Sequence, residues 1–398
     1  MKGEIDLDFN FTAEQEMIAQ TARRIAKKFG PEYWYEKEEN RQLGREFYEE
    51  MARAGFLGFG IPEKYGGNGL GLTEAVIAIE ELCSNGGGLA PALYYLIGVI
   101  FGGMSVIKHG NEEQKEKYLP RLARGEMMVS LGLTEPDAGT DTLSIRTFAR
   151  RDGDDYVING SKIFISGVED AGAMVLVTRT TRKEDTPKKS WGLSLFVIDL
   201  PQEAIMHTEI PKHGINYAKT YELGIDGLRV PKSCLLGEEG KGWHHILDTL
   251  NPERIIAAAG ATGTARLAIG KAVEYASQRK VFDRFIGAHQ GVQFPLASAF
   301  AKIECARLAT LKAAALYDRG ELSKEVGDVA NIAKYAAVEA GIEAVYHAMQ
   351  TFGGYGFARE YHVERWWREI QLMRLAPVTQ QMTLNYIGEH ILGLPKSY

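Results

Sequence analysis

The chain opens with apolar residues at the spacing of an amphipathic helix. Thr12 and Gln15 have the spacing of a capping box, in which each side chain satisfies a backbone N–H group of the other residue. The apolar positions that follow recur every three or four residues and so share one helix face; they are Ile18, Ala22, Ile25 and Phe29. We expect Gly30 and Pro31 to end this helix, because both residues interrupt helical structure.

Further helices are predicted in the same part of the chain, over residues 45–53 and 73–83, and Asn111 is placed to cap another with Gln114. The apolar run at residues 92–104 is shorter than the ~20 residues that cross a membrane. It predicts a buried helix rather than a membrane span. The glycine-rich stretch at residues 66–71 does not follow a strand, so we expect a loop and not a phosphate-binding site.

The pattern changes to short apolar runs typical of strands near Met128. Strands are predicted over residues 128–133, 173–178, 193–199 and 221–230. Asn159-Gly160, between short runs at residues 156–158 and 162–165, predicts a β-hairpin. The polar, mostly basic stretch at residues 179–189 is expected to be a solvated hairpin tip.

Helical periodicity returns after Gly240 and continues to the end. Long helices are expected over residues 243–280, 293–318, 324–352 and 377–391, and helices of this length pack into a bundle. The chain therefore divides into a helical domain over residues 1–128, a β domain over residues 129–239 and a helical bundle over residues 240–398.

The composition excludes several classes of protein. The 398 residues are 45% hydrophobic and 25% charged, which is ordinary for a soluble globular protein. The net charge of -6 gives no basic excess for nucleic-acid binding. Cys83, Cys234 and Cys305 predict reduced, buried thiols in a reducing compartment, and residues 1–11 contain no secretory or arginine-rich leader, so we expect a cytoplasmic protein. The histidine spacing predicts no metal site.

Two polar blocks stand out in the predicted β domain. Residues 133–141 read Leu-Thr-Glu-Pro-Asp-Ala-Gly-Thr-Asp, and residues 160–166 read Gly-Ser-Lys-Ile-Phe-Ile-Ser. Glu135-Pro136 forces an extended residue and then a turn, and Gly139 lets the backbone approach a ligand closely. These residues alone are explained about equally well by an ordinary structural turn and by a turn that binds a ligand.

These blocks resemble the flavin-binding signature of the acyl-CoA dehydrogenase family, with Asp137 and Thr140 where Gly and Ser are common. The resemblance covers nearly the whole chain and implies a mostly α fold with a central β domain: an N-terminal helical domain, a middle β-barrel and a C-terminal four-helix bundle. It implies an FAD cofactor. The residues expected at the flavin are Leu133, Thr134, Gly139, Thr140, Phe164 and Ser166, with Thr140 also near the substrate.

Phe164 stands where the family often has Trp, and its ring would cover one face of the flavin while Ser166 meets the ring edge. The alternative is that Phe164 is part of the β-domain core. Two segments of the bundle also resemble family motifs and imply contacts with the FAD of a neighbouring subunit, hence a dimer or a homotetramer built as a dimer of dimers. Their residues are Arg279, Phe282, Gln290, Gln350, Gly353 and Gly354, with Asp283 replacing the usual Gly.

The catalytic base is not in its commonest family position. There the chain has Ala376, whose backbone N–H is expected to bind the thioester carbonyl, followed closely by Thr379 and Gln380 as expected cofactor contacts. Isovaleryl-CoA and long-chain relatives instead carry the glutamate in a Glu-Arg pair on a bundle helix. The matching residues here are Glu253 and Arg254.

Glu253 is therefore the predicted base, and Arg254 and Asn251 are predicted to contact the CoA chain. The alternative is that Glu253 is an ordinary first-turn helix residue favoured by the helix dipole. Tyr94 and Tyr95 match the segment that lines the acyl pocket in the family, with plain helix packing as the alternative.

The resemblance implies α,β-dehydrogenation of an acyl-CoA thioester, with electrons passed to an electron-transfer flavoprotein. The Glu-Arg pair also occurs in relatives that reduce enoyl-CoA esters, so the direction stays open. An oxygen-using flavin monooxygenase or oxidase on the same scaffold, and an inactive flavoprotein, are the remaining alternatives.

Overall fold

Seven helices form the first part of the computed structural model, which describes residues 10–320 and 323–397. They are α1 (Ala13–Lys28), α2 (Pro31–Asn40), α3 (Arg45–Arg53), α4 (Leu72–Leu82), α5 (Ala90–Tyr95), α6 (Gly103–His109) and α7 (Glu112–Ala123). Both predicted capping boxes are present, at Thr12 with Gln15 and at Asn111 with Gln114. The prediction made on residues 1–11 lies almost entirely outside the described residues.

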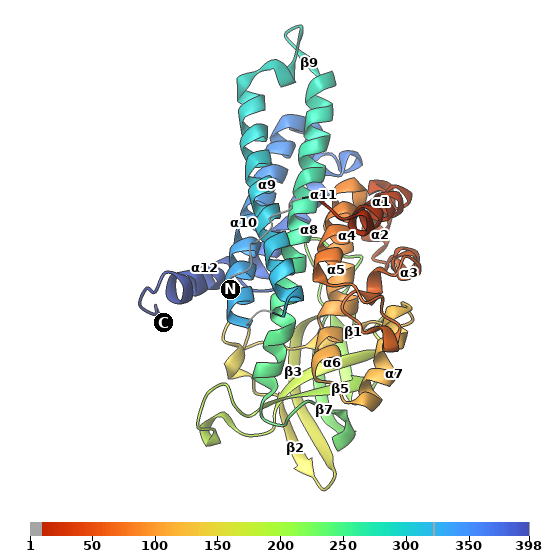
Figure 1. Cartoon of the computed structure of the whole chain (residues 1–398), viewed down its shortest axis with the longest axis vertical. Helices are drawn as coiled ribbons and strands as arrows, with labels where there is room; N and C mark the ends of the chain where they lie inside the picture. The colour runs from red at the N-terminus through yellow and green to blue at the C-terminus, as the bar shows by residue number, and fades with distance from the viewer. Residues whose placement is uncertain (1–9, 321–322, 398) are drawn as a thin grey trace, which may run out of the picture.

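The apolar segment that includes α5 and α6 is a core element. Within the described residues, the stretch Ala90–His109 is long and apolar enough to cross a membrane, but 89% of its most apolar window is buried inside the protein. Figure 1 shows this segment lying alongside the long helix α8 (Gly242–Gln278). The prediction of a buried helix is confirmed.

Eight strands form one sheet in the middle of the chain, in the order β6-β7-β3-β2-β4-β5-β8, with β1 paired to β4. Three of them, β2, β6 and β8, were not predicted. The strands are β1 (Val129–Gly132), β2 (Phe148–Asp152), β3 (Asp155–Ser166), β4 (Ala173–Arg179), β5 (Leu193–Asp199), β6 (Ile205–Glu209), β7 (Thr220–Pro231) and β8 (Leu235–Leu236).

The predicted hairpin at Asn159-Gly160 is wrong. These residues lie inside the continuous strand β3, and the hairpin turn is at Gly153, between β2 and β3. Gly160 has φ +152° at a β-bulge opposite β7, and an added Cβ atom would lie 2.5 Å from the Thr147 hydroxyl. The Asn159 side chain accepts a hydrogen bond from the Gly227 N–H (2.8 Å). The two residues that suggested a turn therefore form a bulge.

The C-terminal part is a bundle of α8, α9 (Gln290–Asp318), α10 (Ser323–Phe352) and α11 (Val363–Leu375), followed by the short α12 (Gln380–Tyr386). The helix predicted over residues 377–391 begins only at Gln380, and α11 was not predicted. One reason is that Arg365 and Glu369, an ion pair at 3.0 Å, occupy the buried face of α11 and interrupt its apolar pattern.

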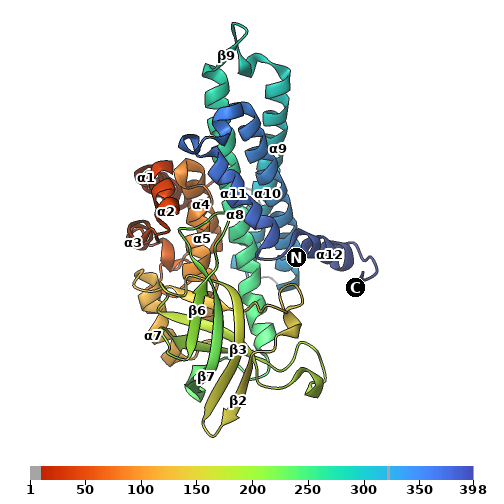
Figure 2. The same cartoon turned by 180° about the vertical axis from the view of Figure 1, so that it is seen from behind.

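The bundle places two ends of the molecule far apart. The β sheet packs at one end of α8, and the small hairpin of β9 (Lys280–Val281) and β10 (Arg284–Phe285) projects from the other (Figure 1). The reverse view in Figure 2 shows the same separation. Because α8 has 37 residues, it spans about 55 Å.

Candidate active site

A buried ion pair holds the polar turn at residues 133–141. The Glu135 carboxylate accepts hydrogen bonds from the Arg146 and Thr147 N–H groups (2.7 and 2.9 Å) and from Lys162 Nζ (2.9 Å). Lys162 Nζ also donates to the Leu133 carbonyl (2.9 Å). Lys162 is fully buried. The turn is thus tied to strand β3 through one side chain.

The surroundings of this ion pair shift the pKa of both Lys162 and Glu135. Burial lowers the pKa of Lys162 to about 8, against the opposing attraction of Glu135. Burial by itself would raise the pKa of Glu135, but Lys162 and the hydrogen bonds from residues 146 and 147 lower it below its ordinary value. The pair therefore stays ionised at neutral pH. The sequence suggested a turn at Glu135 but no partner for it, although a lysine such as Lys162 inside an apolar strand is a usable signal of a buried ion pair.

Phe164 lies on the surface and not in the core. Its side chain is 62% exposed, and its φ of +60° is rare for a bulky residue. The irregular register between Lys162 and Ile165 turns the ring outward. The β-core alternative is therefore excluded. An exposed ring beside a polar turn is suited to cover a flat ligand.

The other predicted residues of this region surround the same turn. The Thr134 carbonyl accepts the Ile163 N–H (2.9 Å), and the Ser166 hydroxyl lies 3.1 Å from the Thr220 hydroxyl. Gly139 and Thr140 are exposed, and an added Cβ atom at Gly139 would meet nothing within 4 Å. The turn thus offers open backbone and hydroxyl groups to a ligand.

A second group of predicted residues lines a cavity of about 660 Å³ at the far end of the bundle. Within the described residues, no side-chain hydrogen bond or ion pair engages the Arg279 guanidinium. Added Cβ atoms at Gly353 and Gly354 would meet nothing within 4 Å. Tyr275 and Phe352 stack at 4.4 Å beside them. A free guanidinium, open glycine backbone and an aromatic surface fit the adenosine diphosphate part of FAD. Gln350 also lines this cavity.

The hairpin at this end forms a two-residue turn at Phe282 and Asp283, with φ of +51° and +62°. Positive φ at both positions defines a type I′ turn, which Asp tolerates well in place of Gly. Phe282 is 95% exposed, and Gln290 is exposed at the start of α9. These side chains project from the bundle and contact little of their own chain.

Within one chain, the turn group and the hairpin group lie at opposite ends of α8 (Figures 1 and 2). The helix between them is about 55 Å long. The two groups of one subunit therefore cannot both contact the same FAD molecule. Two copies are needed if both groups bind the same FAD.

Glu253 lies within α8 in a dry environment. It is 6% exposed, and among the described residues its carboxylate has no hydrogen-bond partner. Burial raises the pKa of Glu253 to about 7, although the adjacent Arg254 opposes the shift. Glu253 is not in the first turn of a helix, because α8 begins at Gly242. The interpretation as a dipole-stabilised first-turn residue is therefore wrong.

Arg254 and Asn251 are joined by a hydrogen bond from Arg254 Nη1 to Asn251 Oδ1 (3.1 Å). The Arg254 Nε atom is buried and has no partner among the described residues. Burial lowers the pKa of Arg254 below its usual value, and Glu253 opposes that shift. An unsatisfied guanidinium N–H beside Glu253 is available to a ligand acceptor.

The segment after α11 does not present the groups predicted there. The Ala376 N–H donates to the Leu372 carbonyl (2.9 Å), so its single hydrogen is engaged and does not serve the thioester carbonyl in this conformation. The Thr379 hydroxyl caps α12 by accepting the Met382 N–H (3.2 Å). Gln380 is buried and bonds to Lys334 Nζ (2.9 Å) and Glu339 (3.0 Å).

Lys334 is the residue that ties this segment to the bundle. Its buried Nζ donates to the Val378 carbonyl (2.8 Å) as well as to Gln380. Burial and the nearby Arg254 lower the pKa of Lys334 to about 8, while Glu339 opposes the shift. Sequence reasoning missed this residue, because a lysine in a helix is usually exposed.

Tyr94 and Tyr95 are both buried among other side chains. The Tyr94 hydroxyl accepts the Gly44 N–H, and its ring packs on Trp34 and Tyr217. The structure thus gives Tyr94 the packing role that was the alternative interpretation. Their predicted role in the acyl pocket has no further support.

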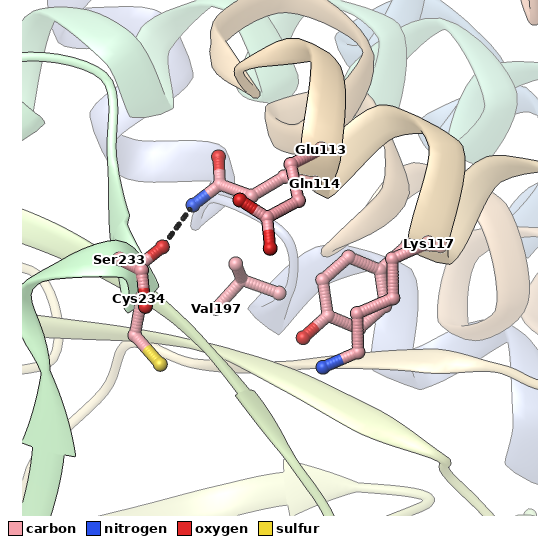
Figure 3. Close-up of a pocket in the computed structure, with 7 residues that line it drawn as sticks. Glu113, Gln114, Lys117, Val197, Ser233 and Cys234 are labelled. Atoms are coloured by element: carbon pink, nitrogen blue, oxygen red, sulfur yellow. Dashed lines mark hydrogen bonds between the residues drawn. The ribbon is translucent and has the colours of Figure 1, made fainter.

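A smaller cavity of about 70 Å³ lies between α7 and the β domain, away from every predicted site residue. Figure 3 shows Gln114 of α7 reaching across it to the Ser233 carbonyl (2.8 Å). Cys234 also lines it. All three cysteines are free, but only Cys83 is buried and Cys305 is exposed, so the prediction of buried thiols is wrong for Cys305.

Because the pKa of Glu253 is raised, we expect the free energy of unfolding to depend on pH. The carboxyl favours the folded state only when protonated, so its contribution is complete below its ordinary pKa and is lost as the pH rises past about 7. The shift corresponds to about 3 kcal/mol. Between about pH 5 and pH 9, Glu253→Gln should therefore gain about 3 kcal/mol in unfolding free energy relative to wild type, measured by denaturant titration. If the difference in unfolding free energy between Glu253→Gln and wild type does not change with pH, the raised pKa of the buried Glu253 carboxyl is wrong.

Comparison with known proteins identifies the relatives. Three domain models match in order: the N-terminal domain of acyl-CoA dehydrogenases over residues 12–126, the middle domain over 130–228 and the C-terminal domain over 240–392. Acyl-CoA dehydrogenase fadE12 of Mycobacterium bovis is 37% identical over 393 residues, which is 99% of this chain and 100% of the relative.

Two further relatives match over almost their whole length. The 3-(aryl)acrylate reductase of Clostridium sporogenes is 34% identical over 96% of this chain and 99% of its own. The structure of butyryl-CoA dehydrogenase from Megasphaera elsdenii superposes with a TM-score of 0.91 at 31% identity, covering 97% of this chain and 100% of that one.

Proposed function

The chain belongs to the acyl-CoA dehydrogenase family, and from this we propose that it oxidises the α,β-carbon bond of an acyl-CoA thioester, with Glu253 as the base that removes the α-proton. Members of this family are FAD-dependent oxidoreductases that act on CH–CH bonds. The observation that carries the proposal is the buried carboxyl of Glu253, which has no hydrogen-bond partner among the residues that the structure describes, in a chain that has Ala376 at the commonest base position.

The side chains around the base explain how it works. Burial raises the pKa of Glu253 to about 7, and a more basic carboxylate is a better acceptor for a weakly acidic C–H proton. Arg254 holds its charge beside the base and presents an unsatisfied N–H. Bound FAD supplies the acceptor for the β-hydride.

The reverse direction is the second candidate, favoured by the 34% identity with a 3-(aryl)acrylate reductase. In that direction Glu253 donates its proton to the α-carbon of an unsaturated ester. A group with a pKa near 7 serves as acid or base at neutral pH. The same residue is therefore required in either direction.

A homotetramer, built as a dimer of dimers, is the assembly we infer. Two observations support it: the two groups predicted to bind FAD lie toward opposite ends of α8, a helix of 37 residues that is about 55 Å long, and large apolar side chains are exposed on the bundle. Those on α9 and α10 are Phe294, Phe300, Leu308, Ile332 and Tyr346. The family resemblance supports electron-transfer flavoprotein as the electron acceptor. The three free cysteines support a reducing compartment such as the cytoplasm.

The test is anaerobic reduction of the FAD-loaded enzyme by a panel of straight, branched, dicarboxylic and alicyclic CoA esters. Loss of visible flavin absorbance with at least one saturated ester is the expected result. If only unsaturated esters react, by reoxidising the chemically reduced enzyme, the physiological direction is reduction. If no ester changes the flavin in either state, the proposed function is wrong. Rapid reoxidation by air with an oxygenated product indicates an oxygen-using enzyme instead.

A further inference from the structure

Polar side chains follow one face of α8 away from Glu253. His245, Thr249 and Glu253 are spaced four residues apart, so they lie above one another along the helix. Thr249 is fully buried within the contact between the N-terminal helices and the bundle. A polar row in an otherwise apolar contact is unusual enough to require a reason.

Helix α6 supplies a matching row from the opposite side. The Ser105 hydroxyl lies 2.9 Å from the Thr249 hydroxyl, and Ser105 is also fully buried. One turn further along α6, the rings of His109 and His245 approach to 4.2 Å between centroids. The two helices pack antiparallel, because the higher-numbered residue of α6 meets the lower-numbered residue of α8. Both rows therefore run in register from Glu253 outward.

The outer end of the rows reaches solvent. His109 Nε2 lies 2.9 Å from Asp248 Oδ2, and the Asp248 side chain is 42% exposed. His245 Nδ1 is buried and has no hydrogen-bond partner among the described residues. Burial lowers the pKa of His245, and His109 and His244 act in the same direction, while Asp248 and Glu238 oppose them. His245 is thus mostly neutral near neutral pH, with one ring nitrogen available to take a proton.

We propose that the hydroxyl pair Ser105–Thr249 and the imidazole pair His109–His245 form a proton pathway between Glu253 and solvent. The inference rests on the proposed role of Glu253 as the base. A base in a dry site must release the proton it takes before the next turnover, and the burial of Glu253 restricts direct exchange with water. The polar rows provide a second route, which runs along the same face of α8 toward the N-terminal end of the helix.

The proton balance along the route is simple. Glu253 becomes a carboxylic acid when it takes the α-proton, and it passes that proton through one intervening water to the Thr249 hydroxyl. The water is needed because residues one helical turn apart have Cβ atoms about 5–6 Å apart. Each hydroxyl releases one proton as it accepts one, so neither Thr249 nor Ser105 becomes charged. Ser105 and His109 are also one helical turn apart, so a second intervening water carries the proton to the imidazole pair. His109 takes it at one ring nitrogen and releases a proton from Nε2 beside Asp248.

Solvent exchange at the substrate α-carbon tests the pathway in the FAD-loaded enzyme. The experiment uses an ester that reduces the flavin, at stoichiometric amount, anaerobically in D₂O. Rapid quenching then gives the deuterium at the α-carbon of recovered substrate, and absorbance gives flavin reduction. Thr249→Val removes the hydroxyl at nearly constant volume. We expect its deuterium incorporation, relative to flavin reduction, to fall at least tenfold, because the proton on Glu253 returns to carbon before it exchanges.

A matched control is available in the same helix. Thr264 is also fully buried, but its hydroxyl bonds only to the Gly260 carbonyl of its own helix (2.7 Å), so Thr264→Val should keep the wild-type ratio. If Thr249→Val does not fold, Ser105→Ala removes the other hydroxyl of the pair. A wild-type ratio in the folded variant overturns the pathway.

The Glu253→Gln variant, measured in parallel, separates the two hypotheses. If it reduces flavin at the wild-type rate, Glu253 is not the base, and both the proposed mechanism and the pathway are wrong. If Glu253→Gln is inactive while Thr249→Val and Ser105→Ala exchange normally, only the pathway is wrong.

Discussion

Replacing Glu253 with Gln is expected to lower the rate of flavin reduction by acyl-CoA by about 10²–10⁴-fold, the usual contribution of a general base. The amide has nearly the same shape as the carboxylic acid, and Glu253 is not one of the residues predicted to bind FAD, so the variant should retain bound FAD. Stopped-flow absorbance under anaerobic conditions measures the rate, and the flavin-to-protein absorbance ratio measures cofactor content.

The pH dependence gives this prediction a second readout. Removal of the α-proton needs the carboxylate, so the wild-type rate should rise with pH and reach half of its maximum near the Glu253 pKa of about 7. Glu274 is an exposed residue of the same helix that pairs with Lys271 (2.9 Å), and Glu274→Gln should match wild type throughout. Wild-type turnover in Glu253→Gln would show that another group is the base.

Lys162→Met should remove about 3–5 kcal/mol of folding stability, the usual cost of breaking a buried ion pair by deleting one partner. The large effect arises because Glu135 would remain as a buried carboxylate without its counter-charge. The Leu133 carbonyl would also lose its donor. Denaturant unfolding followed by circular dichroism measures the loss. FAD affinity should fall as well, because the same lysine holds the turn predicted to bind the flavin.

Two further variants test whether burial of the ion pair causes the loss of stability in Lys162→Met. Lys117 and Asp199 form an ion pair of similar length (2.6 Å) in which both side chains are about half exposed, so Lys117→Met should cost no more than about 1 kcal/mol. Adding Glu135→Gln to Lys162→Met removes the stranded charge and should recover part of the stability. If Lys162→Met is no worse than Lys117→Met, the buried pair does not stabilise the turn.

Short-range patterns were the most reliable part of the sequence analysis. The capping boxes at Thr12 and Asn111 depend on residues three apart in the chain, and both formed as expected. Helix α3 has the predicted bounds, Arg45–Arg53. The prediction of a hairpin at Asn159-Gly160 was wrong because the conformation of these two residues depends on distant parts of the chain. Their conformation depends on Thr147 and on strand β7, which local rules do not include.

The order of the domains, the family and the candidate base could all be predicted from the sequence, because periodicity and motif spacing are properties of residues close together in the chain. The environment of each site could not be predicted in this way, because it depends on how the elements pack in three dimensions. Burial without a partner gave Glu253 its raised pKa, packing of α6 on α8 joined Ser105 to Thr249, and the length of α8 separated Phe164 from Arg279. These properties arise from residues distant in the chain, since desolvation and hydrogen-bond partners depend on what packs against a side chain and not on what precedes it.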